Sequence, residues 1–424
     1  MRTRIAAILL ATAATPLGAA IIGHMTPPTS LTPEKVAGLP ADARAAWNAY
    51  LARSVTAMAR DKAVLAAEHR AGTSIPPAPP EAKGHRNTMP LDRDPAWYAS
   101  ADARAVADNI VSFQTPAGGW GKNQDRSGPP RVPGQSYIPV DDKGGAHLAQ
   151  DGGGGWSFVG TIDNDATTTE IAFLARVQAA VPGPQGERYR TALLKGVRYL
   201  LDAELPGGGW PQVYPLQGLY HDALTLNDDA MLHAVQVMRD VGSGRGDYAF
   251  VPAALRTAAA AAEARGIATI LATQVVIGGK RTIWAQQYDP ITRQPIGARN
   301  FEPVALATNE SAAVLRFLMA QPAPTPAIRQ AVADGAAWFA AHGITDVAWT
   351  ASSGPDGRRL VASPGAGPIW ARFYDPATGK PIFGDRDRSI HDDVNEISVE
   401  RRNGYSWWGN AGAGVAKAYA KWRP

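Results

Sequence analysis

One segment occurs twice in the C-terminal half of the chain, and this repeat limits the folds that the chain can adopt. The two copies begin at Trp284 and Trp370 and match as W-A-x-x-Y-D-P-x-T-x-x-P-I. A looser third copy begins at Trp210, so that the copies are 74 and 86 residues apart. This spacing leaves room for a helical hairpin between copies, and repeats of such length indicate stacked or circularly arranged units.

A second recurrence, Gly-Gly-Trp, ends at Trp120, Trp156 and Trp210. From residue 95 onward, amphipathic stretches of roughly 12 to 20 residues alternate with loops rich in Gly, Pro and aromatic residues. We therefore predict an all-α toroid of helical hairpins, with equivalent loops gathered at one end to form a groove. An alternative interpretation is that the aromatic residues only pack helix ends together, and both interpretations are compatible. The expected helices are Trp97–Gln114, Thr167–Ala180, Glu187–Leu205, Asn227–Asp240, Pro252–Thr273, Glu302–Met319, Pro326–His342 and Ala411–Lys421.

The N-terminal part predicts two further segments. Arg2 and Arg4 precede an apolar run at 5–14 and small residues, which is typical of a secretory signal peptide at 1–20. The alternative is an ordinary N-terminal helix. Residues 21–94 are predicted to be a helical lead followed by a Pro-rich strap, and 95–424 the toroid domain. The signal peptide predicts a secreted or periplasmic protein.

Composition excludes several classes of function. The chain has no cysteine, which excludes thiol chemistry and disulfides. Its 42 Lys and Arg against 38 Asp and Glu are too balanced to indicate nucleic-acid binding. The apolar run at 5–14 is shorter than the roughly 20 residues of a membrane span. We expect a monomer with neither a nucleic-acid partner nor a membrane span, although a local cationic groove for a polyanion remains compatible with this balance.

Two acidic clusters stand where a loop becomes a helix. One contains Asp163, Asn164 and Asp165, and the other contains Asp228 beside Asn227. Helix capping would explain any one of these residues. Two clusters that both combine Asp with Asn also suit a hard cation such as Ca²⁺, which takes carboxylate and amide oxygens. The eight histidines are scattered without an HExxH pattern, so we expect no zinc site.

Cationic residues occur repeatedly in the Gly- and aromatic-rich loops. Lys122, Arg299, Arg372, Arg386 and Arg402 all lie in such loops. A lone surface arginine is usually only solvated, but a guanidinium also matches the geometry of a carboxylate or phosphate. Tryptophan faces suit the C–H faces of sugar rings. Cations, tryptophans and an acidic cluster together indicate an acidic polysaccharide as the partner.

Nine strings in the same order resemble the pectate lyases of polysaccharide lyase family 10, over about residues 98–422. The resemblance implies an incomplete (α/α) toroid. It also implies cleavage of α-1,4-polygalacturonate by calcium-assisted anti-β-elimination, which gives 4,5-unsaturated oligogalacturonides. The strings are GGWGKN, TIDNDATTTE, GGWPQVYPL, LNDDAM, WAQQYD, ARNFEP, WARFYD, IFGDRD and RRNGYSWWGN.

The resemblance also implies roles for individual residues. Arg299 of ARNFEP would be the base, and Asp163 and Asp228 would bind Ca²⁺. The implied substrate contacts are Arg372, Arg386, Asn164, Lys122, Arg402 and Tyr405.

An arginine base needs a physical reason, because arginine is normally protonated at any ordinary pH. We expect neighbouring cations to lower the pKa of Arg299, since like charges disfavour its charged form. We therefore expect the reaction rate to have an alkaline pH optimum. The alternative for Arg299 is a salt bridge to Glu302.

Two other functions remain open from the sequence. A glycoside hydrolase on the same scaffold would use two carboxylates, for which Asp163 and Asp228 are candidates. A non-catalytic polysaccharide-binding protein would keep the tryptophans and arginines but tolerate loss of Arg299. The substrate of a lyase could also be another uronate polymer, such as alginate.

Overall fold

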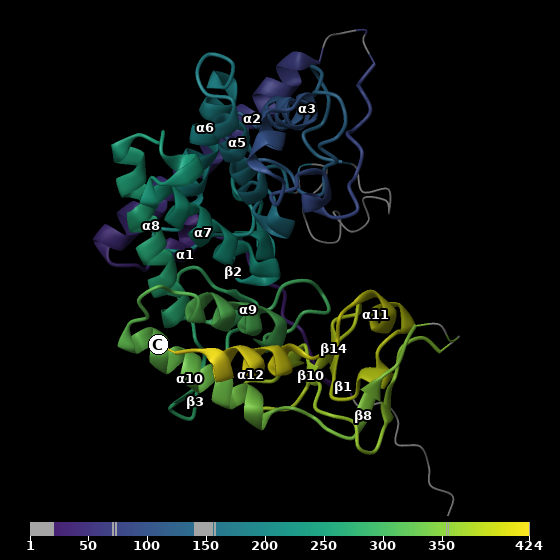
Figure 1. Cartoon of the computed structure of the whole chain (residues 1–424). Coiled ribbons are helices and arrows are strands. Elements are labelled where there is room, and N and C mark those ends of the chain that lie inside the picture. The colour runs from purple at the N-terminus through teal and green to yellow at the C-terminus, as the bar shows by residue number, and fades with distance from the viewer. Residues whose placement is uncertain are drawn as a thin grey trace, which may run out of the picture.

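The computed structural model describes residues 21–423, apart from 70, 71, 73, 140–155, 157, 353 and 355. The predicted signal peptide and Gly154 and Gly155 of the middle Gly-Gly-Trp lie outside these residues. Figure 1 shows two groups of helices, one that runs from the N-terminal part of the chain to α8 (Ala253–Ala272) and one from α9 (Thr308–Met319) to the C-terminal end. No helix among the described residues has both the length and the apolar character needed to cross a membrane.

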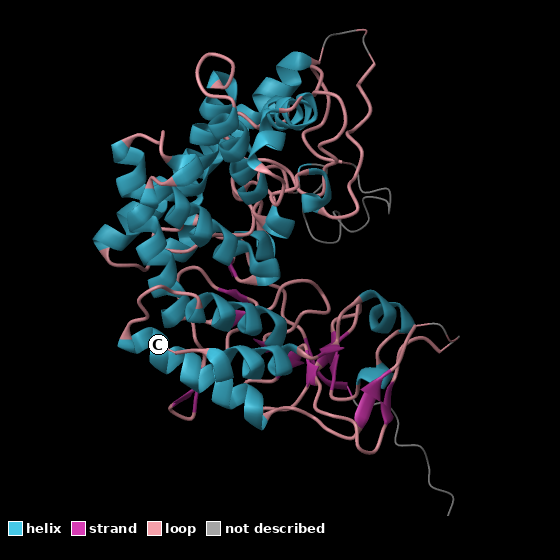
Figure 2. Ribbon diagram, in the orientation of Figure 1, coloured by secondary structure: helices cyan, strands magenta, loops and turns pink. Residues whose placement is uncertain are grey.

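The structure is mainly helical, and the helices pair as hairpins (Figure 2). Helix α5 packs on α6, α7 on α8, and α9 on α10, while α12 covers α9 and α10. All eight expected helices are present, although the one expected at 302–319 begins only at Thr308. The helices are α1 (Pro33–Val36), α2 (Ala41–Glu68), α3 (Ala101–Ser112), α5 (Thr168–Ala180), α6 (Glu187–Ala203), α7 (Ala230–Ser243), α8 (Ala253–Ala272), α9 (Thr308–Met319), α10 (Pro326–Ala341), α11 (Val399–Gly404) and α12 (Ala411–Lys421). The predicted all-α class and its helical hairpins are thereby confirmed.

Short antiparallel strands join the loops at the hairpin ends. In the described part of the chain they form six small sheets with the orders β1-β13-β12, β10-β14, β11-β7, β2-β5-β6, β3-β4 and β8-β9. The strands are β1 (Ile21–His24), β2 (Leu224–Thr225), β3 (Val276–Ile277), β4 (Lys280–Arg281), β5 (Gln287–Tyr288), β6 (Pro295–Ile296), β7 (Leu306–Ala307), β8 (Val347–Trp349), β9 (Leu360–Ala362), β10 (Trp370–Ala371), β11 (Phe373–Tyr374), β12 (Phe383–Gly384), β13 (Ser389–His391) and β14 (Trp408–Gly409).

Four buried tryptophans in the loops that follow helices make the same hydrogen bond. Each donates its indole N–H to a backbone carbonyl in the last turn of the preceding helix, where carbonyls have few intrahelical partners. Nε1 of Trp120 donates to Ile110 at 2.7 Å, that of Trp210 to Leu200 at 2.7 Å, that of Trp284 to Ile270 at 2.7 Å, and that of Trp370 to Phe339 at 2.9 Å. The sequence repeat is therefore a structural repeat in which each tryptophan is bonded to the end of the helix that precedes it.

Helical glycines make room for three of these indoles. A Cβ atom at Gly196 of α6 would lie 2.9 Å from the ring of Trp120, and one at Gly266 of α8 would lie 3.0 Å from that of Trp210. A Cβ atom at Gly412 of α12 would lie 2.3 Å from the ring of Trp370. Each indole thus packs directly on a neighbouring helix backbone.

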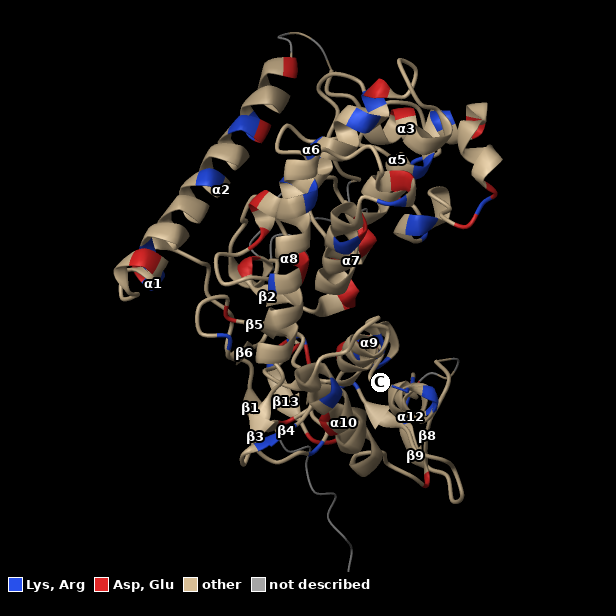
Figure 3. Ribbon diagram, turned by 60° about the vertical axis from the view of Figure 1, so that its left-hand side comes forward, with Lys and Arg blue, Asp and Glu red and all other residues tan. Residues whose placement is uncertain are grey.

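The segment before residue 95 packs on both groups of helices. Strand β1 pairs with β13 near the C-terminal end of the chain. Helix α2 buries Trp47, Tyr50 and Leu51 in the main core, and Tyr50 donates its hydroxyl to the Ala203 carbonyl at 3.1 Å. The rest of α2 carries charged residues of both signs along its length (Figure 3).

Replacing Trp284 with Phe should remove the indole N–H and leave the buried Ile270 carbonyl with only the longer hydrogen bond from the Thr273 hydroxyl, at 3.1 Å. We expect the free energy of unfolding to fall by about 1–3 kcal/mol, measured by urea denaturation. The matched control is Trp422→Phe, since Trp422 is only partly buried. Equal effects of the two substitutions would contradict this role for the repeat.

Candidate functional site

The two acidic clusters adopt the same unusual backbone conformation. Each forms a single 3₁₀ turn, at Asp163–Asp165 and Asn227–Asp229. Asn164 has φ 50° and Asp228 has φ 49°, in the left-handed region that Asn and Asp tolerate better than most residues. Among the described residues, neither Thr167 nor Asp229 caps the helix that it precedes through its side chain. Helix capping is therefore not what explains these clusters.

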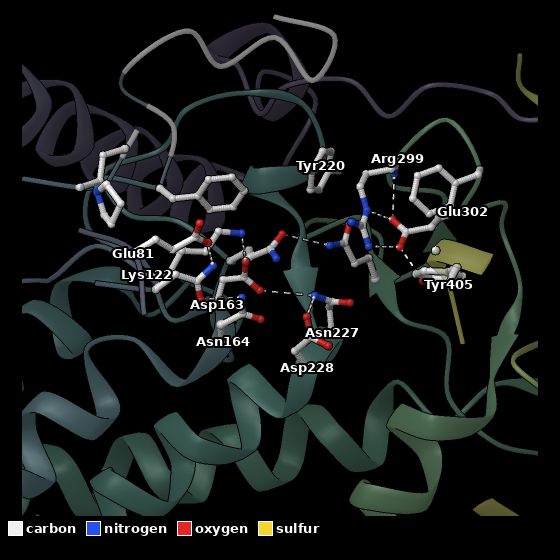
Figure 4. Close-up of a pocket in the computed structure, with 18 of the residues that line it drawn as sticks. Glu81, Lys122, Asp163, Asn164, Tyr220, Asn227, Asp228, Arg299, Glu302 and Tyr405 are labelled. Carbon is white, nitrogen blue, oxygen red and sulfur yellow. Dashed lines mark hydrogen bonds and ion pairs between the residues drawn. The ribbon is translucent and has the colours of Figure 1, made fainter. Parts of the chain in front are cut away.

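Both clusters open into one cavity of about 370 Å³. Asp163, Asn164 and Asp228 line one side of it, and Arg299 and Glu302 line the other (Figure 4). The two that lie farthest apart along the chain, Asp163 and Glu302, are more than 130 positions apart, yet the hairpin loops bring them together. The cavity is thus the place where the predicted metal ligands and the predicted base meet.

Asp163 is buried and paired with Lys122. The Lys122 ammonium lies 2.5 Å from Asp163 Oδ2 and 3.5 Å from the centre of the Phe158 ring. Burial alone raises the pKa of Asp163, but the charge of Lys122 and its hydrogen bond outweigh burial and lower it. Asp163 is therefore a carboxylate ready to bind a cation.

The pKa of Asp228 shifts in the opposite direction to that of Asp163. Burial, and secondly the charge of Asp163, raise the pKa of Asp228. The Asn227 side chain donates to Asp228 Oδ2 at 2.7 Å and approaches Asp163 Oδ1 at 3.5 Å. A divalent cation would relieve the repulsion between the two carboxylates. Among the described residues, no group of three or more His, Cys, Asp or Glu side chains is arranged to hold a metal ion.

Arg299 reaches the cavity from the loop after β6 and is paired with Glu302. Its Nε donates to Glu302 Oε2 at 2.9 Å, and its Nη2 donates to Oε1 at 2.5 Å. Glu302 also accepts from the backbone N–H of Arg299 at 3.1 Å and from the Tyr405 hydroxyl at 2.6 Å. The salt bridge considered as the alternative for Arg299 is present, and Arg299 still lines the cavity.

The expectation that neighbouring cations lower the pKa of Arg299 was wrong. Burial does disfavour the guanidinium charge, but the carboxylate of Glu302 stabilises it more and raises the pKa of Arg299 well above its ordinary value. The same pair lowers the pKa of Glu302 to about 2, against the effect of burial. The carboxylate within hydrogen-bond distance of Arg299, that of Glu302, therefore decides the direction of the pKa shift.

Four of the six predicted substrate contacts line this cavity, namely Lys122, Asn164, Arg386 and Tyr405. Arg372 lies instead in an adjoining cavity of about 1030 Å³, where it pairs with Glu310 at 2.6 Å. That cavity shares Asn164 and Asp228 with the first, so the two form a continuous groove.

Arg402 lines neither cavity, so the structure does not bring it together with the other predicted substrate contacts. Its Nη1 donates to the carbonyls of Asn395 and Ile397 at 2.9 and 2.6 Å, and its Nη2 donates to that of Asp356 at 2.7 Å. These bonds fold the loop around α11. The preceding residue, Arg401, lines the cavity in its place.

Sequence reasoning missed a buried group that supports the cavity floor. Glu170 accepts from Arg126 at 2.7 Å and lies 3.0 Å from His85, whose other ring nitrogen meets the backbone N–H of Asn123 at 3.1 Å. Asn123 in turn accepts from Asn164 at 3.1 Å. Glu170 ends the string TIDNDATTTE, so its position beside the acidic cluster was the available signal.

We expect Glu170→Gln to lower stability by about 3–5 kcal/mol at pH 7, because it leaves buried Arg126 without its anion. Burial raises the pKa of Glu170, but His85 and Arg126 lower it to about 2, below the value of about 4.3 in an unfolded chain. Its ionisation therefore stabilises the fold above pH 4.3, and this contribution is lost as the pH falls towards 2.

The measurement is the midpoint of urea unfolding between pH 7 and pH 3 for the wild type, Glu170→Gln and the exposed control Glu187→Gln. The gap between wild type and Glu170→Gln should narrow as the pH falls. A gap that stays constant over this range would contradict the assignment.

Comparisons with known proteins agree with this site. The family model described as pectic acid lyase matches residues 114–416. A mutant of a family 10 polysaccharide lyase from Cellvibrio cellulosa, in complex with trigalacturonic acid, is 32% identical with a TM-score of 0.65. The match covers 80% of this chain and 98% of that one. A second structure of the family 10 polysaccharide lyase from Cellvibrio cellulosa is also 32% identical, with a TM-score of 0.64 and coverage of 79% and 97%.

The comparison with curated proteins returned no match. The family model spans most of the chain and includes both acidic clusters, Arg299 and Arg401. The resemblance seen in the nine sequence strings is confirmed. The chain therefore belongs to the pectic acid lyase family, and it is a polysaccharide lyase.

Proposed function

We propose that the protein is a pectate lyase that cleaves α-1,4-polygalacturonate by calcium-assisted anti-β-elimination and releases 4,5-unsaturated oligogalacturonides. One observation carries this proposal. The carboxylates of Asp163 and Asp228 and the guanidinium of Arg299 line the same cavity from opposite sides (Figure 4). The complex of the similar Cellvibrio enzyme with trigalacturonic acid supports a galacturonate polymer as the substrate.

The residues present fit a calcium site that is open to substrate. Asp163 offers a buried carboxylate and Asp228 a solvent-exposed one, and the charge of Asp163 is the second cause, after desolvation, of the raised pKa of Asp228. Ca²⁺ takes about six to eight oxygens, so the proposal includes water and uronate oxygens as further ligands. When bound, the ion would withdraw charge from the uronate carboxylate and so acidify the C5 proton.

Arg299 is the proposed proton acceptor. It takes the C5 proton, the C5–H electron pair forms the C4–C5 double bond, and the C4–O bond breaks with its electron pair on oxygen. That oxygen then gains a proton from water. Glu302 occupies Nε and Nη2 of Arg299, which leaves Nη1 as the nitrogen directed to substrate.

The pair with Glu302 has a direct consequence for the pH dependence. A base must be deprotonated before it accepts a proton. Because the pKa of Arg299 lies above its ordinary value, its neutral fraction rises with pH throughout the neutral and alkaline range. The rate should therefore increase with pH, as an alkaline optimum requires. A rate that peaks near pH 5 would contradict an arginine base.

We also propose export by the signal peptide at 1–20, on the basis of its charge and hydropathy pattern. Mass spectrometry of protein secreted by an expressing cell should give a new N-terminus close to Ala19 or Ala20. An intact Met1 would contradict export by this route.

The substitution Arg299→Ala should lower kcat on polygalacturonate by about 10²–10⁴-fold, the usual contribution of a positioned general base. Turnover is measured by the ultraviolet absorbance of the unsaturated product, and binding of trigalacturonic acid is measured separately by calorimetry. We expect binding to persist. The control is Arg281→Ala, because Arg281 is exposed on β4.

Two results would contradict this account in different ways. Cleavage without an unsaturated product would indicate hydrolysis through the two carboxylates. Binding without any turnover in the wild type would indicate a polysaccharide-binding protein.

Chelation should abolish turnover, and added Ca²⁺ should restore it. Asp163→Asn and Asp228→Asn should each raise the Ca²⁺ concentration that gives half-maximal rate, because each removes a charged oxygen ligand. The control Asp92→Asn, at an exposed position, should leave the Ca²⁺ dependence unchanged. Full activity in chelator would contradict the calcium-assisted mechanism.

A further inference from the structure

Residues 25–31, which we call the brace, connect the two groups of helices. The brace begins directly after strand β1, which pairs with β13 in the C-terminal group. It ends just before helix α1, which packs on α2 beside the N-terminal group (Figure 1). The family model matches only from residue 114 onward, so the brace lies outside the matched region. Its contacts nevertheless lead to the cavity.

One end of the brace holds the turn that carries Tyr220. Ser30 Oγ accepts a hydrogen bond from the backbone N–H of Leu219 at 2.9 Å. The backbone N–H of Leu31 donates to Asp222 Oδ2 at 3.1 Å. Tyr220 stands between these two contacts in the sequence and lines the same cavity as Arg299 (Figure 4).

This turn needs support because its backbone conformation is unfavourable. Leu219 has φ 54°, and Gly218 before it has φ 95°. The left-handed region is strained for a leucine, and such a conformation persists only where its surroundings hold it. Asp222 Oδ1 accepts from the backbone N–H groups of Gln217 and Gly218 at 3.0 and 2.8 Å. Asp222 and the brace therefore hold the turn from both sides of Leu219.

The other end of the brace supports the loops of two cavity arginines. The backbone N–H of Met25 donates at 2.8 Å to the carbonyl of Arg388, which has φ 73° and belongs to the turn that carries Arg386. Met25 is 6% exposed, and a Cβ atom at Gly297 would lie 3.3 Å from its Cε. The Met25 side chain thus packs on the loop that leads to Arg299. Both arginines, Arg386 and Arg299, line the cavity.

A further cavity of about 260 Å³ lies between the brace and two of these loops. Atoms that face a cavity have no packing partner on that side. The two loops therefore depend on their direct contacts with Ser30 and Met25 for their positions. The lining includes Pro27, Pro28 and Leu31 of the brace, Leu219 of the Tyr220 turn, and Ile296 and Gly297 of the Arg299 loop.

We propose that the brace fixes the positions of Tyr220 and Arg299 relative to each other, with Ser30 and Met25 as positioning residues. Ser30 acts through Tyr220, which lines the cavity and contacts the bound polymer. Met25 acts through the loop of Arg299 and so through proton transfer. A misplacement of about 1 Å in a reacting group can slow a reaction about 10²-fold. This inference rests on the proposed function, because it concerns how residues of that site are held.

The first test is Ser30→Ala, which removes the acceptor of the Leu219 N–H. We expect KM for polygalacturonate to rise about two- to tenfold, the usual effect of one lost hydrogen bond, with little change in kcat. The affinity for trigalacturonic acid should fall by the same factor in calorimetry. The matched control is Ser100→Ala, because Ser100 Oγ also accepts a backbone N–H, that of Ala103 at 3.2 Å, at the start of α3. The control should lower the midpoint of urea unfolding and leave KM and affinity unchanged.

The second test is Met25→Ala, which removes the side chain that packs on the Arg299 loop. We expect kcat to fall about ten- to hundredfold, while KM and the affinity for trigalacturonic acid stay close to those of the wild type. Met25→Leu keeps the volume of the side chain and should retain kcat. Both variants keep the backbone N–H that binds Arg388, so their difference reports packing on the loop alone.

Three results would overturn the inference. If Ser30→Ala lowers only the unfolding midpoint, as Ser100→Ala does, the brace has a merely structural role. If Met25→Ala keeps the wild-type kcat, or if Met25→Leu loses as much as Met25→Ala, packing by Met25 does not position Arg299. Wild-type protein that binds trigalacturonic acid but yields no unsaturated product would refute the proposed function alone, since the affinities of the wild type and Ser30→Ala still decide the role of the brace.

Discussion

The hydrogen bond between an indole N–H and the end of a helix is the interaction on which the rest of the structure depends. It recurs at Trp120, Trp210, Trp284 and Trp370, and each time it satisfies a carbonyl in the last turn of a helix. Because each indole is buried against the end of a helix, it ties the loop that contains it to that end in every repeat. Equivalent loops therefore gather at one end of the hairpins and carry the polar residues into one groove.

The two acidic clusters and Arg299 line different sides of the groove. Asp163 and Asp228 stand on one side, and Arg299 and Glu302 stand on the other. Arg299 is held in the wall by its hydrogen bonds to the buried carboxylate of Glu302. A polyanion of uronic acids matches this arrangement, because its carboxylates can meet a cation on one face and guanidinium groups on the other.

Much of the fold was predictable because it depends on local spacing. The tryptophan repeat, eight helices and the two Asp/Asn clusters could be read from the sequence, and the structure contains all of them. Which of two neighbouring side chains faces the cavity could not be predicted from the sequence. Arg401 and Arg402 are neighbours on a helix and point about 100° apart, so an error of one residue exchanges a cavity residue for one that binds backbone carbonyls.

The direction of the pKa shift of Arg299 also could not be predicted from the sequence. It depends on the buried carboxylate of Glu302, whose Oε1 lies 2.5 Å from Nη2 of Arg299. The cations expected to lower the pKa of Arg299 are not among the main causes of its shift. Coulomb energy falls with distance and is strongest in a buried pair, so one contact outweighs several remote charges. Helix α9 begins at Thr308 and not at Glu302, because Glu302 belongs to the loop that holds Arg299 and strand β7 lies between that loop and the helix.

The most direct measurement is a crystal structure with Ca²⁺ and trigalacturonic acid, prepared at acidic pH, where turnover should be slow. The account predicts the ion bound between a uronate carboxylate and Asp163 and Asp228, with a nitrogen of Arg299 about 3–3.5 Å from C5 of the same sugar. A sugar whose C5 faces away from Arg299, or an ion bound away from both aspartates, would contradict it.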